Sequence, residues 1–168
     1  MTPQKKTIDI DGSEAVSKVL LDFLNTFPGV AESKKILFAT LSEASGIGFF
    51  PTAGAVLQSN TEDVTGHVKQ VCLYPFNIVY RAALKSESQR MRAKEWLDTL
   101  GKWLEKQEVT LGKEKHKIKN YPALKAGNRT IKSINRTSPA YFNAAYQDGV
   151  EDWLLSCTVT YENEFDKY

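Results

Sequence analysis

Few residue patterns in this chain have a spacing that suits catalysis. An acyltransferase of the chloramphenicol type needs a histidine four residues before an Asp-Gly pair, because the imidazole removes the proton of the substrate hydroxyl. Asp148-Gly149 is present, but Ala144 stands where that histidine belongs. The sequence has no Gly-x-Ser-x-Gly elbow and no Walker A loop, and Gly46-Ile47-Gly48 lacks the third glycine of a dinucleotide-binding loop. We therefore expect a protein that is not an enzyme and binds no cofactor.

Carboxylates near the C-terminus are the remaining candidates for acid–base chemistry. Glu162 and Glu164 share one parity of a predicted strand, and Glu151-Asp152 precede the same strand. A pair of carboxylates is the machinery of a glycosidase. Exposed carboxylates at strand ends more often protect a sheet edge. We interpret these groups as surface charge and predict no catalytic residue.

Histidines and cysteines are too few and too scattered to predict a metal site. His67 and His116 are the only histidines, Cys72 and Cys157 are the only cysteines, and none of the pairs has the spacing of a zinc motif. Both cysteines lie in apolar, strand-like runs, which favours two reduced thiols in the core over a disulfide. We expect no bound metal.

The one distinctive charge feature is a basic run with a lysine at every second position: Lys113, Lys115, Lys117 and Lys119. Three interpretations stay open, namely a solvated loop, a docking arm for an acidic partner surface, and a contact with DNA. The net charge of the whole chain is only +2 at pH 7. This is too small to predict a dedicated nucleic-acid-binding domain.

Composition fits a single globular domain over residues 1–168. A chain of 168 residues that is 42% hydrophobic, 11% aromatic and 25% charged can bury a core without disulfides or metals. Residues 1–6 include the basic Lys5 and Lys6, but no apolar run follows them, so a signal peptide is not predicted. No apolar run approaches the roughly 20 residues of a membrane span. We expect a protein that folds inside the cell and does not enter a membrane.

Two helices are predicted from apolar stripes at helical period. The first covers about residues 11–27, with Asp11 at the N-cap of a capping-box pattern and Pro28-Gly29 as its stop. The second covers about residues 86–106, with Ser86 at the N-cap of a second capping box. Each helix should bury one face in the core.

Strands are predicted from apolar runs and from period-two alternation. Residues 34–41 are apolar on both faces, which favours a central strand. Residues 68–81, 130–136 and 153–162 predict further strands, and the last of these alternates most regularly. Pro75 cannot donate to a ladder, so its strand should be bulged there or lie at an edge.

Extended loops are expected at about residues 42–66 and 107–128. The first includes Phe49-Phe50, exposed in a loop or short edge strand, and a short strand candidate at 55–57; the second is a loop or exposed hairpin. A further loop, residues 137–149, carries three aromatic residues. The predicted fold class is α+β: a two-layer domain with a mainly antiparallel sheet of four to five strands and both amphipathic helices packed on one face.

Three segments of the sequence resemble a family of prophage tail-module proteins of phages of Gram-positive bacteria, grouped with minor capsid and tail-terminator proteins. They are Gly66–Arg81 (GHVKQVCLYPFNIVYR), Lys94–Leu104 (KEWLDTLGKWL) and Tyr146–Trp153 (YQDGVEDW), the last with its strand closing in Tyr161–Phe165 (YENEF). These segments are core and turn patterns and contain no catalytic signature. Members of this group sometimes carry a chloramphenicol-resistance label, which Ala144 contradicts here.

The resemblance implies a tail-terminator-like fold and a structural role in a virion. Such a protein forms a ring, typically sixfold, on the last ring of the tail tube, stops further polymerisation and presents a surface to the head. The implied partners are other copies of the chain, the tail tube protein and the head–tail connector protein, while DNA only passes through the lumen. The implied location is the bacterial host cytoplasm during assembly and then the head-proximal end of the virion tail.

A closed ring needs heterologous contacts, in which one patch of a subunit fits a different patch of the next. Large apolar groups in loops commonly mark such interfaces. For the aromatic candidates, a simple role in capping the core stays open. The candidate assembly residues are Phe49, Phe50, Lys113, Lys115, Lys117, Lys119, Tyr141 and Phe142.

Two other functions stay open. The first is a head-completion or stopper protein, which would bind on the portal side of the joint. The second is a nucleic-acid-binding module that uses Lys113 to Lys119.

Overall fold

In its described residues the protein has an α+β fold with two helices and a mostly antiparallel sheet of seven strands. The computed structural model describes residues 12–31, 34–52, 55–124 and 129–167. Strands β5 and β6 form a separate two-stranded sheet. The elements are α1 (Gly12–Leu24), β1 (Ile36–Phe38), β2 (Gly46–Pro51), β3 (Val56–Glu62), β4 (His67–Ala83), α2 (Glu87–Leu104), β5 (Val109–Leu111), β6 (Glu114–His116), β7 (Arg129–Arg136), β8 (Tyr141–Ala145), the 3-10 turn η1 (Gln147–Gly149) and β9 (Val150–Asp166).

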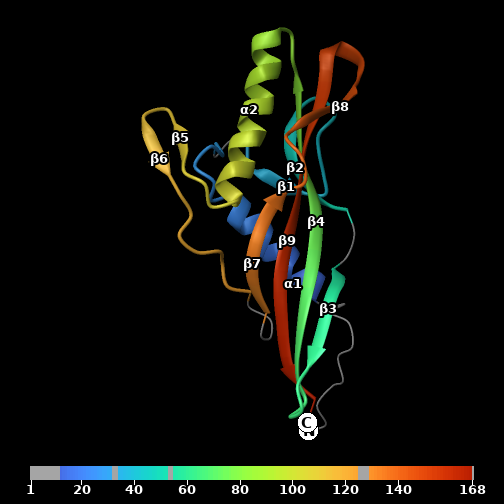
Figure 1. Cartoon of the computed structure of the whole chain (residues 1–168). Coiled ribbons are helices and arrows are strands. Elements are labelled where there is room, and N and C mark those ends of the chain that lie inside the picture. The colour runs from blue at the N-terminus through green and yellow to red at the C-terminus, as the bar shows by residue number, and fades with distance from the viewer. Residues whose placement is uncertain (1–11, 32–33, 53–54, 125–128, 168) are drawn as a thin grey trace.

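Two long strands form the spine of the sheet. β4 and β9 each have 17 residues and pair antiparallel without a register shift, from His67 opposite Asp166 to Ala83 opposite Val150. Figure 1 shows the pair running the length of the molecule. Each spine strand carries two short strands on its free side: β2 and β3 on β4, and β7 and β8 on β9.

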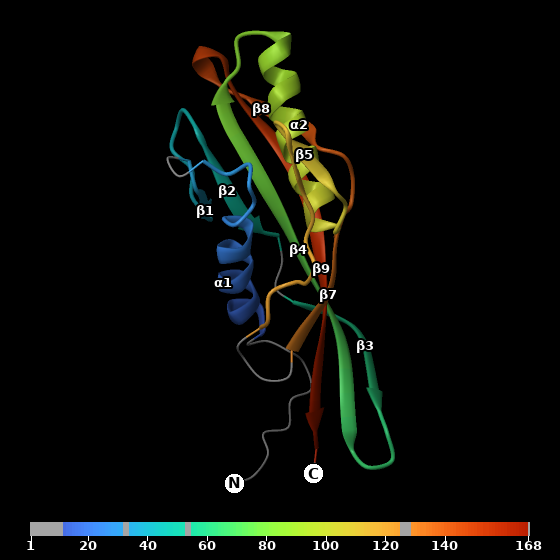
Figure 2. The same cartoon turned by 90° about the vertical axis from the view of Figure 1, so that its left-hand side faces the viewer.

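Both helices pack on the face of β4 that carries its even-numbered residues. Ser17 of α1 is hydrogen-bonded to the hydroxyl of Tyr74, and Trp96 of α2 packs against the ring of Tyr80. The helices also meet each other, since Phe23 stacks on Trp103 at 5.0 Å between ring centroids. Figure 2 shows α1 and α2 beside the spine, which extends past them at the end that carries β3.

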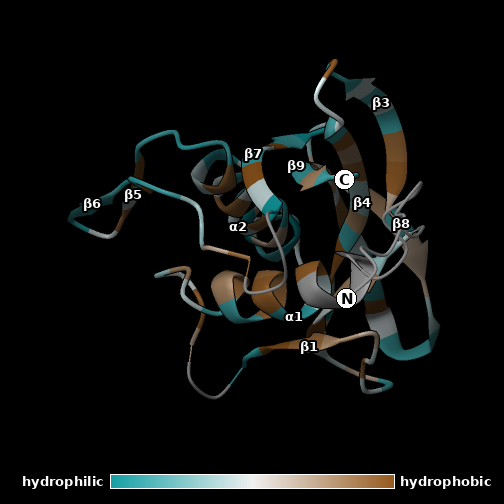
Figure 3. Cartoon of the chain, turned by 90° about the horizontal axis from the view of Figure 1, so that it is seen from below, coloured by the Kyte–Doolittle hydropathy of each residue, from teal (hydrophilic) through white to brown (hydrophobic). Residues whose placement is uncertain are grey.

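The predicted four to five strands and simple two-layer packing are wrong, because the sheet has seven strands and curls. β1 pairs parallel with β2, and α1 lies between β1 and the spine (Figure 3). Asn25, directly after α1, fixes this arrangement: its side chain accepts from the Ile36 N–H at 2.8 Å and donates to the Ile36 carbonyl at 3.1 Å. β1 is therefore an edge strand and not the central strand that its apolar sequence predicted.

Two predicted loops contain three strands, of which β2 and β3 overlap the short strand candidates at Phe49-Phe50 and at residues 55–57. β2 and β3 lie within residues 42–66, and β8 lies within residues 137–149. The local sequences of these three strands show little alternation. The strands form because they pair with the spine, with β4 or with β9. The segment 107–128 does contain the exposed hairpin that was one of the two predictions for it.

The helices match their predictions closely. Ser86 is the N-cap of α2, and its hydroxyl accepts from the Gln89 N–H at 3.3 Å, while the Gln89 side chain accepts from the Lys85 N–H at 2.6 Å. α1 ends at Leu24, slightly before the predicted end. The predicted cap at Asp11 lies outside the described residues. Neither helix, within the part of the chain that is described, is long and apolar enough to cross a membrane.

Pro75 causes neither a bulge nor a break in the spine. It pairs in register with Thr158 of β9, and its carbonyl accepts from the Thr52 N–H at 3.1 Å on the other side. In an antiparallel strand, the nitrogen and carbonyl of one residue point the same way. The Pro75 nitrogen, which has no hydrogen to donate, therefore faces the gap between the end of β2 and the start of β3. At this gap β4 is locally an edge strand, where proline is tolerated.

Phe49 is a core residue and not a loop residue. It is fully buried in β2 and packs against Phe76, Phe38 and Tyr74 with ring centroids 5.1 to 6.4 Å apart. The expectation that it is exposed for assembly is wrong, and the alternative of a core role is confirmed. Phe50 is partly buried on the other side of the same strand.

We predict that Phe49→Ala lowers the free energy of unfolding by about 3–5 kcal/mol, because it empties the centre of an aromatic cluster. Phe50→Ala is the matched control on the same strand and should cost clearly less. Urea denaturation followed by tryptophan fluorescence measures both. Equal losses would contradict the placement of Phe49 in the core.

Candidate functional site

The four predicted lysines lie on the exposed hairpin β5–β6 and the segment that follows it. Gly112-Lys113 form its two-residue turn, and Gly112 has a φ of 63°, as a type II′ turn requires at its first position. The four lysines are exposed, whereas His116 and Ile118 between them are partly or fully buried. The alternation of lysine with inward-facing residues therefore directs the charges outward. We call β5–β6 with residues 117–119 the lysine hairpin.

The base of the lysine hairpin is anchored to the domain. Val109 and Ile118 are buried in the main core. After the hairpin, the hydroxyl of Tyr121 donates to the Leu104 carbonyl at 2.7 Å and accepts from the Ile134 N–H at 3.3 Å, which ties the segment to α2 and β7. The hairpin is thus a positioned arm that stands out from the body (Figure 1).

The lysines are largely without acidic partners. Lys115 approaches Glu108 at 3.7 Å, but both side chains are well exposed, so this ion pair contributes little. Among the described residues, no ion pair is found for Lys113, Lys117 or Lys119. The arm therefore presents uncompensated positive charge.

Tyr141 and Phe142, also predicted, are exposed on the short strand β8. Their exposed fractions are 41% and 48%. Phe142 contacts Trp153 of β9 with its edge, at 5.9 Å between ring centroids. The rings of Tyr141 and Phe142 therefore lie at an edge of the sheet, beside backbone groups of β8 that pair with no further strand in the described structure.

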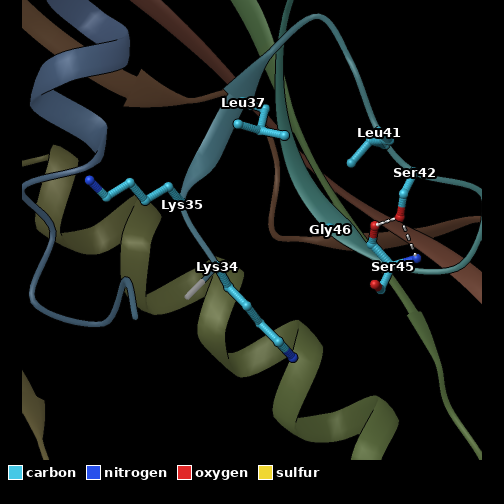
Figure 4. Close-up of a pocket in the computed structure, with 7 residues that line it drawn as sticks. All are labelled: Lys34, Lys35, Leu37, Leu41, Ser42, Ser45 and Gly46. Carbon is cyan, nitrogen blue, oxygen red and sulfur yellow. Dashed lines mark hydrogen bonds between the residues drawn. The ribbon is translucent and has the colours of Figure 1, made fainter. Parts of the chain in front are cut away.

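A second apolar margin, which the sequence did not predict, is β1. Leu37 and Phe38 are 50% and 46% exposed on this edge strand. Beside it is a shallow cavity of about 390 Å³ lined by Lys34, Lys35, Leu37, Leu41, Ser42, Ser45 and Gly46. Figure 4 shows the two lysines at one end of this cavity and the Ser42–Ser45 turn, closed by side-chain hydrogen bonds, at the other.

A buried ion pair lies on the opposite face of the spine from the helices. Arg81 of β4 is bidentate to Asp152 of β9, at 2.7 and 2.8 Å, and Asp152 also accepts from the Tyr146 hydroxyl at 2.9 Å. The Asp152 side chain is 5% exposed, and these bonds raise the pKa of the guanidinium. Arg81 donates as well to the Ser42 carbonyl at 3.1 Å. The pair thus fixes the β1–β2 loop and the β8–β9 turn on the spine.

Above this ion pair is a hollow of about 590 Å³ whose lining is acidic. Arg81 at its base is neutralised by Asp152, whereas Glu43 and Asp148 are exposed and no ion pair is found for either within the described residues. We call this cavity the acidic hollow. Its lining residues are Glu43, Ala44, Arg81, Ala83, Tyr146, Gln147, Asp148 and Val150.

The C-terminal carboxylates are engaged in ion pairs across the fold. Glu162 lies 3.3 Å from both Lys69 and Lys132, and Glu151 binds Arg90 of α2 at 3.0 Å. These contacts link neighbouring strands or a strand and a helix. The interpretation of these groups as exposed surface charge is wrong for Asp152, which is buried, and the side chains of Glu151 and Glu162 are only 12% and 17% exposed.

At the far end of the spine, the β3–β4 turn is organised by Asp63 and exposes Val64. The Asp63 carboxylate accepts from Thr65 and from the His67 N–H, and the Thr65 hydroxyl bond is the main reason that the pKa of Asp63 is lowered. His67 Nδ1 is 2.8 Å from Asp166 Oδ1, and Glu164 is 3.5 Å from its Nε2. The contact with Asp166 raises the pKa of His67.

No group of three His, Cys, Asp or Glu side chains is placed to hold a metal ion among the residues that the structure describes. Cys72 and Cys157 are buried in the core and form no disulfide. Burial raises the pKa of the Cys157 thiol to about 12, which keeps it protonated and unreactive near neutral pH.

Comparison with known proteins gives no family for this chain: no family model matches it, and no curated protein matches it significantly.

The sequence predicted some of the exposed surface features and missed others. It identified the lysine hairpin and the aromatic pair on β8, but it missed the β1 edge and the acidic hollow. The hollow brings Glu43, Arg81 and Asp148 together from three segments. The sequence could have indicated the hollow only through the pairing of its two longest predicted strands. That pairing places Arg81 beside Asp152.

We predict that Asp152→Ala lowers the free energy of unfolding by about 3 kcal/mol, because Arg81 is left as an unpaired charge. Lys69→Ala, which breaks a more exposed pair, should cost less than about 1 kcal/mol. The double variant Arg81→Met/Asp152→Leu should recover much of the loss. Urea unfolding measures all three, and a small effect of Asp152→Ala would contradict a structural ion pair.

We predict that Asp166→Asn shifts the pKa of His67 down towards its ordinary value of 6.5. Because the folded pKa is raised, the contact stabilises the fold fully below pH 6.5, and this contribution disappears as the pH rises through the folded pKa. Titration of the histidine ring protons by NMR measures the shift. An unchanged His67 pKa in Asp166→Asn would show that the pair does not form in solution.

Proposed function

We propose that this chain is a structural subunit of a phage or phage-like tail, which caps the head-proximal end of the tail tube, stops tube polymerisation and provides the head-joining surface. The proposal combines the resemblance of three sequence segments to tail-terminator proteins with the surface of the fold. In the family it resembles, such subunits act as a ring, typically of six copies.

The observation that carries the proposal is the placement of the exposed apolar groups. Most of them lie at the margins of the sheet: Leu37 and Phe38 on edge strand β1, Val56 on β3, Tyr141 and Phe142 on β8 with Tyr146 after it, and Val64 at the tip of the spine, whereas Met91 lies on α2. Apolar side chains beside unpaired strand edges are the usual material of protein interfaces. Their distribution over several margins suits a subunit that contacts more than one neighbour.

The shape of the molecule also supports a ring subunit. The lysine hairpin projects on one flank, and β8 lies on the opposite flank (Figures 1 and 3). The turn that follows β8 supplies part of the lining of the acidic hollow. A ring requires two different patches on opposite flanks, because each subunit meets one neighbour on each side.

A nucleic-acid-binding role is the second candidate, since the exposed lysines at 113, 117 and 119 have no ion-pair partner in the described part of the chain. Four lysines in an arm can bind phosphates. Such binding would weaken steeply with salt, which a DNA mobility-shift assay at several salt concentrations measures.

We predict that deleting the reading frame of this chain from the genome that encodes it gives tails longer than normal, because nothing then stops the polymerisation of the tube. Expression of the chain from a plasmid should restore the normal length. Electron microscopy of negatively stained particles measures the length distribution.

Free tails of normal length beside unjoined heads would instead support a stopper role on the portal side. Intact particles with joined heads and normal tails would contradict both tail functions.

A further inference from the structure

The lysine hairpin and the acidic hollow are complementary in charge and in form. The hairpin presents lysines that lack strong ion pairs, at a narrow two-residue turn. The hollow is about 590 Å³ in volume, and Glu43 and Asp148 at its rim have no ion-pair partner among the described residues. The positive charge of the hairpin therefore complements the negative charge of the hollow.

The lining of the hollow suits a lysine side chain in particular. Ala44, Ala83 and Val150 form part of its wall, and apolar walls accept the methylene stem of a lysine while its ammonium group reaches a carboxylate. The volume lies within the range of protein pockets that hold small ligands, so the Lys113 side chain at the narrow turn can enter it.

Only another copy of the chain can bring these two surfaces together. The hairpin is anchored beside the C-terminal end of α2 through Tyr121 and Leu104. The turn after β8, which lines the hollow, belongs to the strand on the opposite flank of the sheet (Figures 1 and 3). A contact between unlike patches on opposite flanks is heterologous, and repetition of such a contact closes into a ring or continues as a filament.

We propose that the lysine hairpin of one copy docks into the acidic hollow of the next copy, with Lys113 reaching Glu43 and Asp148. This proposal deepens the proposed function and rests on it for the ring, but the contact itself can be tested with the purified chain. Arg81 and Asp152 act as positioning residues, because they hold the β1–β2 loop and the β8–β9 turn that carry the two acidic groups.

A cysteine pair tests the contact directly. The variant Lys113→Cys/Glu43→Cys should form disulfide-linked dimers, trimers and longer species under mild oxidation, which a non-reducing gel resolves. The variant Lys18→Cys/Glu43→Cys is the matched control, since Lys18 is exposed on α1, outside the hairpin. The native Cys72 and Cys157 are buried and do not compete. A ladder no stronger than that of the control would overturn the proposal.

Charge reversal tests the electrostatic basis. Lys113→Glu/Lys117→Glu and, separately, Glu43→Lys/Asp148→Asn should each weaken self-association by about tenfold. Asparagine is chosen at position 148 because it tolerates the φ of 63° found there. A chain with all four changes, or an equimolar mixture of the two double variants, should regain association, because each reversed hairpin again meets a hollow of opposite charge.

Sedimentation velocity at low salt measures these associations, and Lys18→Glu/Lys102→Glu controls for the change in net charge. Association that is insensitive to the hairpin and hollow variants would overturn the proposal. The two proposals fail separately. A missing disulfide ladder with overlong tails in the deletion strain removes only the contact, while a clear ladder with normal tails removes only the tail function.

Discussion

The structure depends on the pairing of β4 with β9. The two strands stay in register over 17 residue pairs. Six of the other elements are attached to them directly: β2, β3, β7 and β8 by strand pairing, and α1 and α2 by packing. Tyr74, Phe76 and Tyr161, all fully buried, come from these two strands. A spine of this length buries one face under the helices and still extends beyond them, which leaves ends and margins free for contacts.

The two flanks of the sheet differ in charge because different segments of the chain form them. One flank carries a lysine arm whose inward-facing residues, Val109 and Ile118, are anchored in the core. The other flank carries two acidic groups around an ion pair that cross-links the spine. Exposed apolar side chains lie on the short strands β1 and β8. Such an arrangement suits a protein whose activity is to contact neighbours, and the charges give each contact a direction.

The parts of the fold with strong local periodicity were predictable, and the parts held by distant pairing were not. α1, α2, β7 and the two spine strands follow from helical stripes or alternation. The sequence indicates only short strand candidates for β2 and β3 and none for β8. All three are glycine-rich, polar or irregular, and exist because β4 and β9 offer free edges. β1 was assigned as central on its apolar composition, whereas Leu37 and Phe38 are exposed. For the same reason the lysine hairpin was found from sequence, while the hollow, assembled from three segments, was not.

The central claim is that this chain functions as an assembled ring at the joint between tail tube and head. Electron cryo-microscopy of the intact particle tests it most directly, because a fold with a 17-residue spine and a projecting hairpin can be recognised in a density map. The account predicts one ring of this chain, between the last ring of the tube and the connector, with the hairpin of each copy against the next. A particle whose joint is fully built from other chains would contradict it.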